Sequence, residues 1–199
     1  QSGIQFYDGI STAEIQEILI RSASDLIDLD HPNYQFVAAR LLLFALRKNL
    51  YGRVHELPKL KDHVTKCVDK KIYDEDILNS YSDDEFIKLE SFLDHDRDYL
   101  FTYAGLRQVV DKYLVQDRSS GELYETPQFM YLLISATIFS KYPKDARLDY
   151  VKRYYDAISK HKINIPTPIM AGVRTPLRQY ASCVLVDIDD TLDSIFSSD

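Results

Sequence analysis

The stretch NIPTPIMAGVRTPLRQYASCVLVDIDDTLD, residues 164–193, divides this chain of 199 residues into two kinds of structure. Its three prolines and Gly172 interrupt any helix that enters it. The apolar, β-branched run at residues 182–188 then predicts a buried strand. Because the residues before this stretch show mostly helical periodicity, we expect a mainly α fold that leads into one strand.

Cys183 stands at the start of the predicted strand, behind the proline-rich loop. A thiol in that position has two explanations that the residues alone leave open. It can take part in chemistry at the mouth of the strand, or it can be a packed core residue, as most cysteines beside aliphatic residues are.

The composition excludes several classes of protein. The 24 basic and 31 acidic residues give a net charge of −7, whereas a nucleic-acid surface would need a basic stripe. No apolar run approaches the roughly 18 residues that a membrane helix requires. Cys67 and Cys183 lack metal-ligand spacing, so we expect no metal site, no structural disulfide and a reducing cytoplasm. The chain starts at Gln1 and ends at Asp199, shortly after the predicted strand, so we expect it to be part of a longer polypeptide.

Two helices are predicted within residues 1–52. Ser11-Thr-Ala-Glu14 is a capping box that starts the first helix. The second is predicted from about Asn33 to Tyr51, with Gly52 as its stop signal. This second helix is apolar nearly all round, so we expect it to be buried.

Residues 53–162 are predicted to be helical with one hairpin. The apolar face of a helix ending near Lys70 includes Cys67, which predicts an inert buried thiol. Alternating residues on both sides of Gly121, within 112–125, predict a β-hairpin. A buried helix starting at Thr126-Pro127 and an amphipathic helix over about 145–160 follow.

The sequence Asp94-His-Asp-Arg-Asp98 is rich in groups that can bind metal ions. On a helix, however, Asp94 and Asp98 share one face while His95 and Asp96 turn away. We therefore predict a structural role for this motif, as a charged surface or as ion pairs made by Arg97.

Several motifs together resemble the large subunit of aerobic (class I) ribonucleotide reductase. In the last quarter they are Pro166-Thr-Pro-Ile-Met170, Gly172-Val-Arg-Thr-Pro176, Arg178-Gln-Tyr-Ala-Ser-Cys183 and Asp190-Thr-Leu-Asp-Ser194. Further upstream they are Gln5-Phe-Tyr-Asp-Gly9, Ala38-Ala-Arg40, Asp94-His-Asp-Arg-Asp98 and Lys112-Tyr-Leu-Val115. The resemblance covers essentially the whole chain.

This resemblance implies three parts. Residues 1–52 correspond to helices of a partial ATP cone, the nucleotide-sensing domain of the family. Residues 53–162 form its helical N-terminal domain, and residues 163–199 form a loop and the first strand of the catalytic α/β barrel.

The resemblance also implies an active site. Cys183 matches one of the two redox thiols, while Thr167 and Ser182 match substrate-binding positions. Asp190, Thr191 and Leu192 match the start of the site where a deoxynucleotide effector sets specificity. Thr12 and Lys48 match nucleotide contacts of the activity site, although Gln16 and Ala45 replace histidines that many members use for inhibition by dATP.

The function implied is a part of the enzyme that reduces ribonucleoside diphosphates to deoxyribonucleoside diphosphates, inactive as this chain alone. The implied partners are the remaining large-subunit polypeptide, a second copy of the complete subunit, ATP and deoxynucleotide effectors, and thioredoxin or glutaredoxin. No cofactor is expected in this chain, since a metal-containing small subunit supplies the radical. The alternatives are a non-catalytic helical module that senses nucleotides or docks on a reductase, and a helical scaffold protein.

Overall fold

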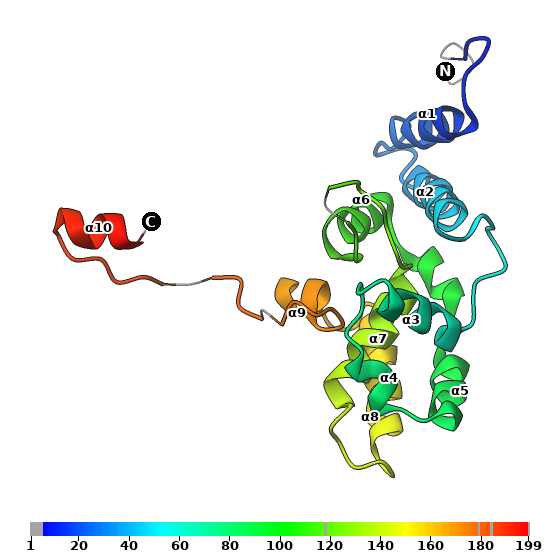
Figure 1. Ribbon diagram of the computed structural model, residues 1–199. Coiled ribbons are helices and arrows are strands. Elements are labelled where there is room, and N and C mark those ends of the chain that lie inside the picture. Colours follow the sequence, from blue (N-terminus) through cyan, green and yellow to red (C-terminus); the bar gives the residue numbers. More distant parts are fainter. Residues whose placement is uncertain (1–5, 118, 179, 184, 199) are drawn as a thin grey trace.

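The computed structural model describes residues 6–117, 119–178, 180–183 and 185–198. These residues are mainly helical, which confirms the predicted fold class. Helices surround α7 in a compact body, and the C-terminal segment extends away from that body (Figure 1).

The first two helices, α1 (Thr12–Ser24) and α2 (Tyr34–Tyr51), pack against each other. Both predicted end signals are present. The Ser11 hydroxyl accepts a hydrogen bond from the Glu14 backbone amide at 3.2 Å, and Gly52 ends α2 with a φ of +68°. The prediction that α2 is buried all round is wrong. One face meets α1 and α6, while Val37 on another face remains 42% exposed.

The middle of the chain forms a series of short helices. They are α3 (Leu60–Asp69), α4 (Asp76–Ser80), α5 (Asp83–Phe92), the 3₁₀-helix η2 (His95–Leu100), α6 (Tyr103–Gln108) and the π-helical turn η3 (Val109–Tyr113). Cys67 on α3 is buried as predicted, and burial raises the pKa of its thiol to about 12. This thiol therefore stays protonated at neutral pH, which agrees with an inert role.

The predicted hairpin exists in a reduced form. A single antiparallel bridge joins Gln116 to Leu123, and Gly121 has a φ of +74° in the turn. The expected first strand is shorter than predicted because η3 continues the helical path, with the Leu114 amide donating to the Val109 carbonyl at 3.0 Å.

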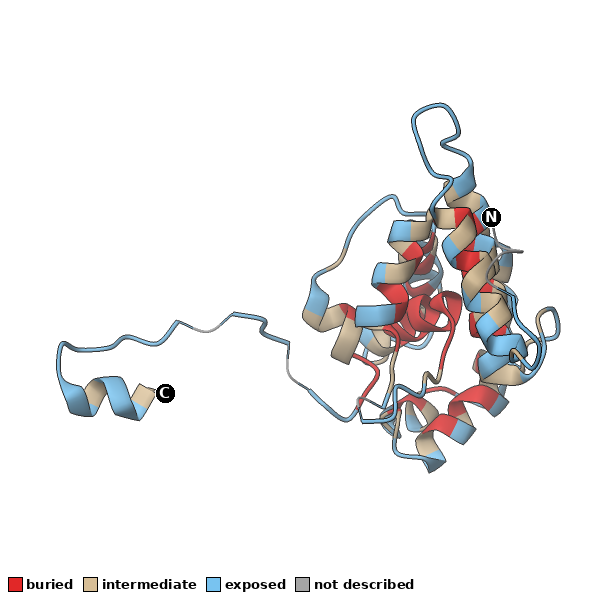
Figure 2. Ribbon diagram, turned by 90° about the horizontal axis from the view of Figure 1, so that it is seen from above, coloured by how far each residue is buried: buried red, intermediate tan, exposed pale blue. Residues whose placement is uncertain are grey.

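The core is built around α7 (Pro127–Phe139), which packs along α8 (Arg147–Ser159). Residues from Pro127 through Ala136 are all buried, as expected for a helix that is apolar on every side. The ribbon of the buried residues, drawn in red, gathers in the middle of the body in Figure 2. Val151, Tyr155 and Ile158 form the apolar stripe of α8 that the sequence predicts.

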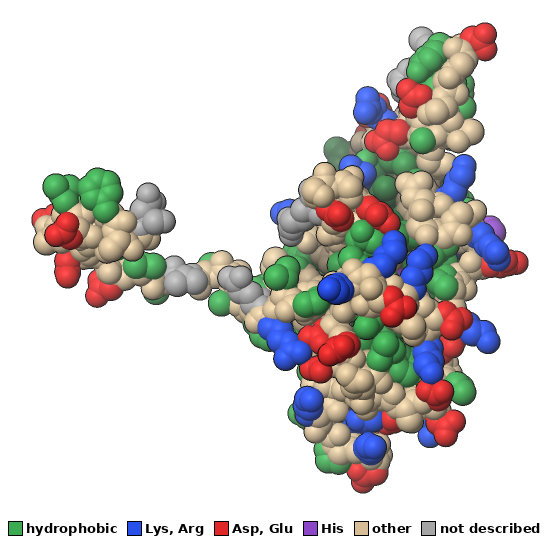
Figure 3. Space-filling model, viewed as in Figure 1, with side chains coloured by type: hydrophobic (Ala, Val, Ile, Leu, Met, Phe, Trp, Pro, Cys, Tyr) green, Lys and Arg blue, Asp and Glu red, His purple; other side chains and the backbone are tan. Residues whose placement is uncertain are grey.

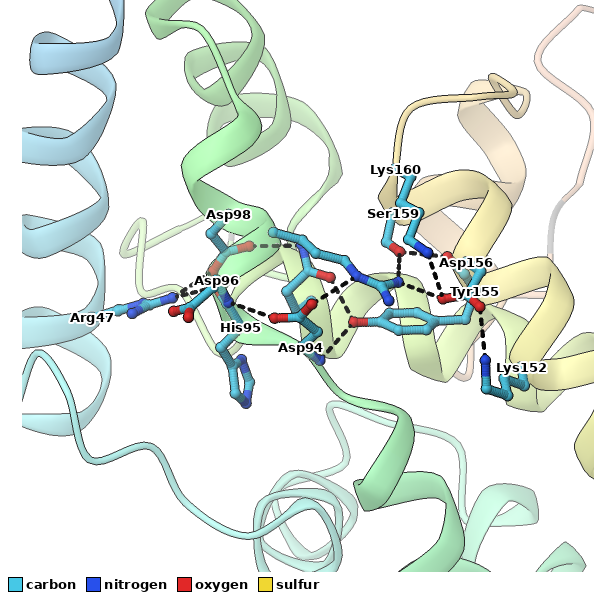
Figure 4. Close-up of polar contacts among 12 residues, drawn as sticks. Arg47, Asp94, His95, Asp96, Asp98, Lys152, Tyr155, Asp156, Ser159 and Lys160 are labelled. Atoms are coloured by element: carbon cyan, nitrogen blue, oxygen red, sulfur yellow. Dashed lines mark hydrogen bonds and ion pairs between the residues drawn. The ribbon is translucent and has the colours of Figure 1, made fainter.

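The 94–98 motif joins α2, η2 and α8 through ion pairs. Arg47 of α2 donates to Asp98 at 3.0 Å, and both side chains are buried (Figure 4). Arg97 pairs with Asp94 at 3.2 Å and with Asp156 of α8 at 2.8 Å. The predicted structural role is thus confirmed for Arg97, and the deeper Arg47–Asp98 pair is an addition from the structure.

The C-terminal segment contains α9 (Thr167–Gly172) and α10 (Leu192–Ser198). The prediction of a buried strand at 182–188 is wrong for the described residues, because Leu185, Val186 and Ile188 are exposed and form no strand. A strand needs hydrogen bonds from a neighbouring strand, and none lies beside it in the described part of the chain. This segment and α10 project from the body and carry exposed apolar side chains (Figure 3).

Among the described residues, no helix combines the length and the apolar character that crossing a bilayer requires.

Candidate functional site

Thr167 begins α9, and the prolines on either side fix its backbone. Pro166 has the extended angles of an N-cap (φ −62°, ψ 147°), and Pro168 lies in the first turn, where a missing N–H is harmless. The Met170 amide donates to the Pro166 carbonyl at 3.1 Å. The Thr167 hydroxyl is therefore exposed at the start of the helix, 3.4 Å from the Tyr113 hydroxyl.

A buried ion pair holds α9 in place from behind. The side chains of Arg174 and Glu125 are 1% and 0% exposed, and the Arg174 Nε donates to both carboxylate oxygens at 3.0 and 2.8 Å. The same guanidinium donates to the carbonyls of Met170 at 2.5 Å and Tyr113 at 2.9 Å. The Arg174 side chain thus connects α9, η3 and Glu125, the residue at the end of the hairpin.

Glu125 also receives hydrogen bonds from the other side of the core. The Tyr73 hydroxyl donates to it at 2.6 Å, and the Val115 amide donates at 2.8 Å. His63 lies 3.1 Å from the Tyr73 hydroxyl and stacks on Phe129. Burial lowers the pKa of His63 to about 4, so its ring is neutral at pH 7 and Arg174 is the charge that balances Glu125.

Thr167 and Ser182 line a single cleft of about 350 Å³, which we call the Thr167 cleft. Its walls are α9 and the segment from Lys112 to Gln116. Among the described residues that line it, Lys112 is the only one with a charge. The hydroxyls of Thr167 and Ser182, those of Tyr113 and Thr175, and one ammonium group suit a ligand that carries phosphate and sugar oxygens.

Cys183 lies next to this cleft. Its Sγ is 3.9 Å from the Ser182 Oγ, and the residue is exposed. A buried strand was expected to shield this thiol from solvent. Among the described residues the segment after Cys183 has no partner strand, so that shielding is not found.

The predicted specificity-site residues lie away from the cleft, at the start of α10. The Thr191 hydroxyl accepts the Ser194 amide at 3.2 Å and so helps to begin the helix. Asp190 is exposed, and Leu192 is 71% exposed. None of the three lines the Thr167 cleft as the described residues define it.

The predicted activity-site residues lie on α1 and α2, and both are exposed. Thr12 is the first residue of α1, and Lys48 is in the last turn of α2. The Gln16 amide donates to the Leu41 carbonyl at 3.1 Å, which connects the beginning of α1 to α2. No hydrogen bond links Thr12 to Lys48 in the described part of the chain.

Lys112, Glu125 and Arg174 were not among the predicted site residues. Arg174 is the single charged residue of Gly172-Val-Arg-Thr-Pro176, which could have signalled a buried pair. Its partner Glu125 is far away in the sequence, so no local pattern identifies it.

Comparisons with known proteins identify related chains. A family model described as "Ribonucleotide reductase, all-alpha domain" matches residues 99–178. Over 195 residues the chain is 56% identical to the ribonucleoside-diphosphate reductase subunit alpha of Haemophilus influenzae and 54% identical to the ribonucleoside-diphosphate reductase 1 subunit alpha of Escherichia coli K12. It is 47% identical over 188 residues to the corresponding subunit of Enterobacteria phage T4.

These alignments cover 98% of this chain for the two bacterial relatives and 94% for the phage relative. They cover only 26%, 26% and 25% of the relatives' own lengths. The chain therefore belongs to the family of ribonucleoside-diphosphate reductase alpha subunits, and it spans about the N-terminal quarter of its relatives.

Proposed function

We propose that this chain supplies one half of an active site that reduces ribonucleoside diphosphates to deoxyribonucleoside diphosphates. One observation carries the proposal: Thr167 and Ser182 line the same cleft with Lys112, and the Cys183 thiol lies 3.9 Å from the Ser182 hydroxyl. In this proposal Thr167 and Ser182 bind the substrate, and Lys112 offsets the charge of its diphosphate.

The overall reaction replaces the ribose C2′–OH bond with a C2′–H bond. The hydroxyl leaves as water, and two thiols become a disulfide as they supply two electrons and two protons. We assign Cys183 to one of these thiols. Cys67 does not suit the other, because it is buried in α3 and burial raises its thiol pKa to about 12. The second thiol and the radical that starts the reaction must come from further polypeptide and from a metal-containing small subunit.

The exposed apolar side chains after Cys183 support a further partner for this segment. Leu185 is fully exposed, and Leu192 and Phe196 are 71% and 75% exposed. Such side chains are favoured at contact surfaces rather than in water. We propose that the rest of the alpha subunit covers them, that Asp190, Thr191 and Leu192 then bind an effector between two copies of the complete subunit, and that thioredoxin or glutaredoxin reduces the disulfide in the cytoplasm.

The test reconstitutes the enzyme from this chain, the remaining alpha polypeptide and the small subunit, and measures deoxyribonucleoside diphosphate formed. Activity should return with the wild-type chain and should be lost with Cys183→Ser. Cys67→Ser is the matched control and should keep the activity. Turnover that persists in Cys183→Ser would refute the role given to this thiol.

The Thr12–Lys48 activity site requires a separate test. Calorimetry of the chain with ATP should show binding that weakens in Lys48→Ala. Lys141→Ala, which removes an exposed ammonium group between α7 and α8, is the control and should bind as the wild type does. Equal heats for all three proteins would contradict the assignment.

A further inference from the structure

A second and larger cleft, of about 540 Å³, shares Tyr113 with the Thr167 cleft. It lies where α6, α7, the end of α8 and the α8–α9 connection meet, and we call it the Phe101 cleft. This volume falls in the range of sites that enclose small organic ligands. None of Thr167, Ser182 and Cys183 lines it as the described residues define it, so it is separate from the proposed active site.

Aromatic rings form one wall of the Phe101 cleft. The rings of Phe101 and Tyr131 are nearly parallel, at 8°, with centroids 6.5 Å apart. The His161 ring is tilted against Phe101, with centroids 4.5 Å apart. Flat ring faces of this kind favour a planar ligand that can stack on them.

The polar groups of the cleft favour a ligand with an acceptor and a negative charge. Tyr131 is only 5% exposed, and its hydroxyl has no hydrogen-bond partner among the described residues. The hydroxyl oxygen is not itself fully buried and Tyr131 lines the cleft, so this group can donate a hydrogen bond to an acceptor atom of a ligand. Among the described lining residues no carboxylate is present, and Lys162 is the only charged one. Its ammonium group makes no ion pair with the described part of the chain.

The backbone at His161 adds a further observation. Lys162 donates its amide to the Ala157 carbonyl at 2.9 Å, and His161 has a φ of +55°. This pattern ends a helix with a left-handed residue, a position that glycine usually occupies. A histidine there strains the backbone and places an imidazole at the wall of the cleft. Partial burial lowers the pKa of this ring, so it is neutral at pH 7 and can stack without a charge.

We propose that the Phe101 cleft binds a planar aromatic molecule that carries one acidic group. Its ring lies against Phe101 and His161, an acceptor atom meets the Tyr131 hydroxyl, and the acidic group faces Lys162. This inference does not depend on the proposed reductase function, because none of the residues assigned to substrate or electron transfer takes part.

Indole-3-carboxylate is a suitable probe, and uncharged indole is its comparison. Titration into the ¹⁵N-labelled chain should give saturable shifts of amide signals in α6 and in the α8–α9 connection. His161→Gly should weaken the binding of both molecules at least about fivefold, since one stacking contact is lost. Lys162→Ala should weaken the binding of indole-3-carboxylate about two- to fivefold and leave the binding of indole unchanged.

The His161→Gly variant also separates binding from folding. Glycine relieves the left-handed backbone, so the melting temperature should stay equal or rise while binding is lost. Lys71→Gly makes the same change at the end of α3, where φ is +59°, and should keep full binding. The proposal is wrong if no saturable shifts occur, if they centre on the Thr167 cleft, or if His161→Gly binds both probes as the wild type does.

Discussion

At the residue scale, two buried pairs of a guanidinium and a carboxylate connect distant parts of the chain. Arg47 pairs with Asp98 and Arg174 pairs with Glu125, and all four side chains are at most 4% exposed. The first pair connects α2 to η2, and the second connects the end of α9 to the hairpin. Removing one partner of such a pair leaves a buried charge without compensation, which is strongly destabilising.

The Arg174–Glu125 pair gives a direct prediction. Glu125→Gln keeps the shape of the side chain but leaves Arg174 unbalanced, so the free energy of unfolding should fall by about 3–5 kcal/mol in urea titrations. Glu56→Gln is the matched control: its pair with Arg53 is 66% and 76% exposed, and its loss should change stability by less than about 1 kcal/mol. Similar losses in both variants would show that the burial of Arg174 is not what stabilises the pair.

Asp98 should produce a distinctive pH dependence. Burial raises its pKa to about 6, although Arg47 and Gln128 act in the opposite direction. In the unfolded chain the pKa of this carboxyl is about 4. Between about pH 4 and pH 6 the folded protein therefore keeps a proton on Asp98 that the unfolded chain has released. The contribution of Asp98 to stability is therefore full below about pH 4 and is lost as the pH rises to about 6.

Comparison with Asp98→Asn isolates this effect from the other carboxylates. Between about pH 4 and 6 the wild type should lose stability with rising pH relative to Asp98→Asn, as measured by urea unfolding at several pH values. Asp98→Asn has no proton to release at this position, so the difference between the two pH profiles reports the titration of Asp98 alone. Parallel pH profiles for the two proteins would contradict the raised pKa.

At the element scale, α7 is the helix on which the others pack. Leu133 is 1% exposed, so Leu133→Ala should lower the free energy of unfolding by about 2–5 kcal/mol through lost contacts and a cavity. Ile138, in the last turn of the same helix, is 37% exposed, and Ile138→Ala should lower it by distinctly less. Chemical denaturation of both variants is the measurement, and a greater loss at Ile138 would be inconsistent with this packing.

The elements also show where sequence patterns succeed. Ser11 and Gly52 mark helix ends as predicted, because capping depends on groups within three or four residues of each other. The prediction of a strand at 182–188 was wrong because a strand depends on partners far away in the sequence. A β-branched run favours a strand, but the strand forms only beside another that accepts its hydrogen bonds.

At the scale of the whole molecule, the body and the projecting C-terminal segment should behave independently. The described side chains of residues 185–193 are exposed, and the hydrogen bonds of α10 are all local. Ending the chain after Cys183 should therefore leave the melting temperature of the body unchanged within about 2 °C, since little buried surface is removed. A fall of more than about 5 °C, in the same calorimetric scan, would indicate that the segment packs on the body.

The sequence by itself determined the mainly α fold, most helix ends, the buried α7 and the family, because periodicity, caps and motifs are local. Its motifs also predict that Thr167, Ser182 and Cys183 act in one active site. Only the tertiary structure decided that Thr167 and Ser182 share a cleft with Lys112, and that Arg174 is held by Glu125 behind it. Arg174 and Glu125 are 49 positions apart in the sequence, and such pairings depend on how the helices pack rather than on any local pattern.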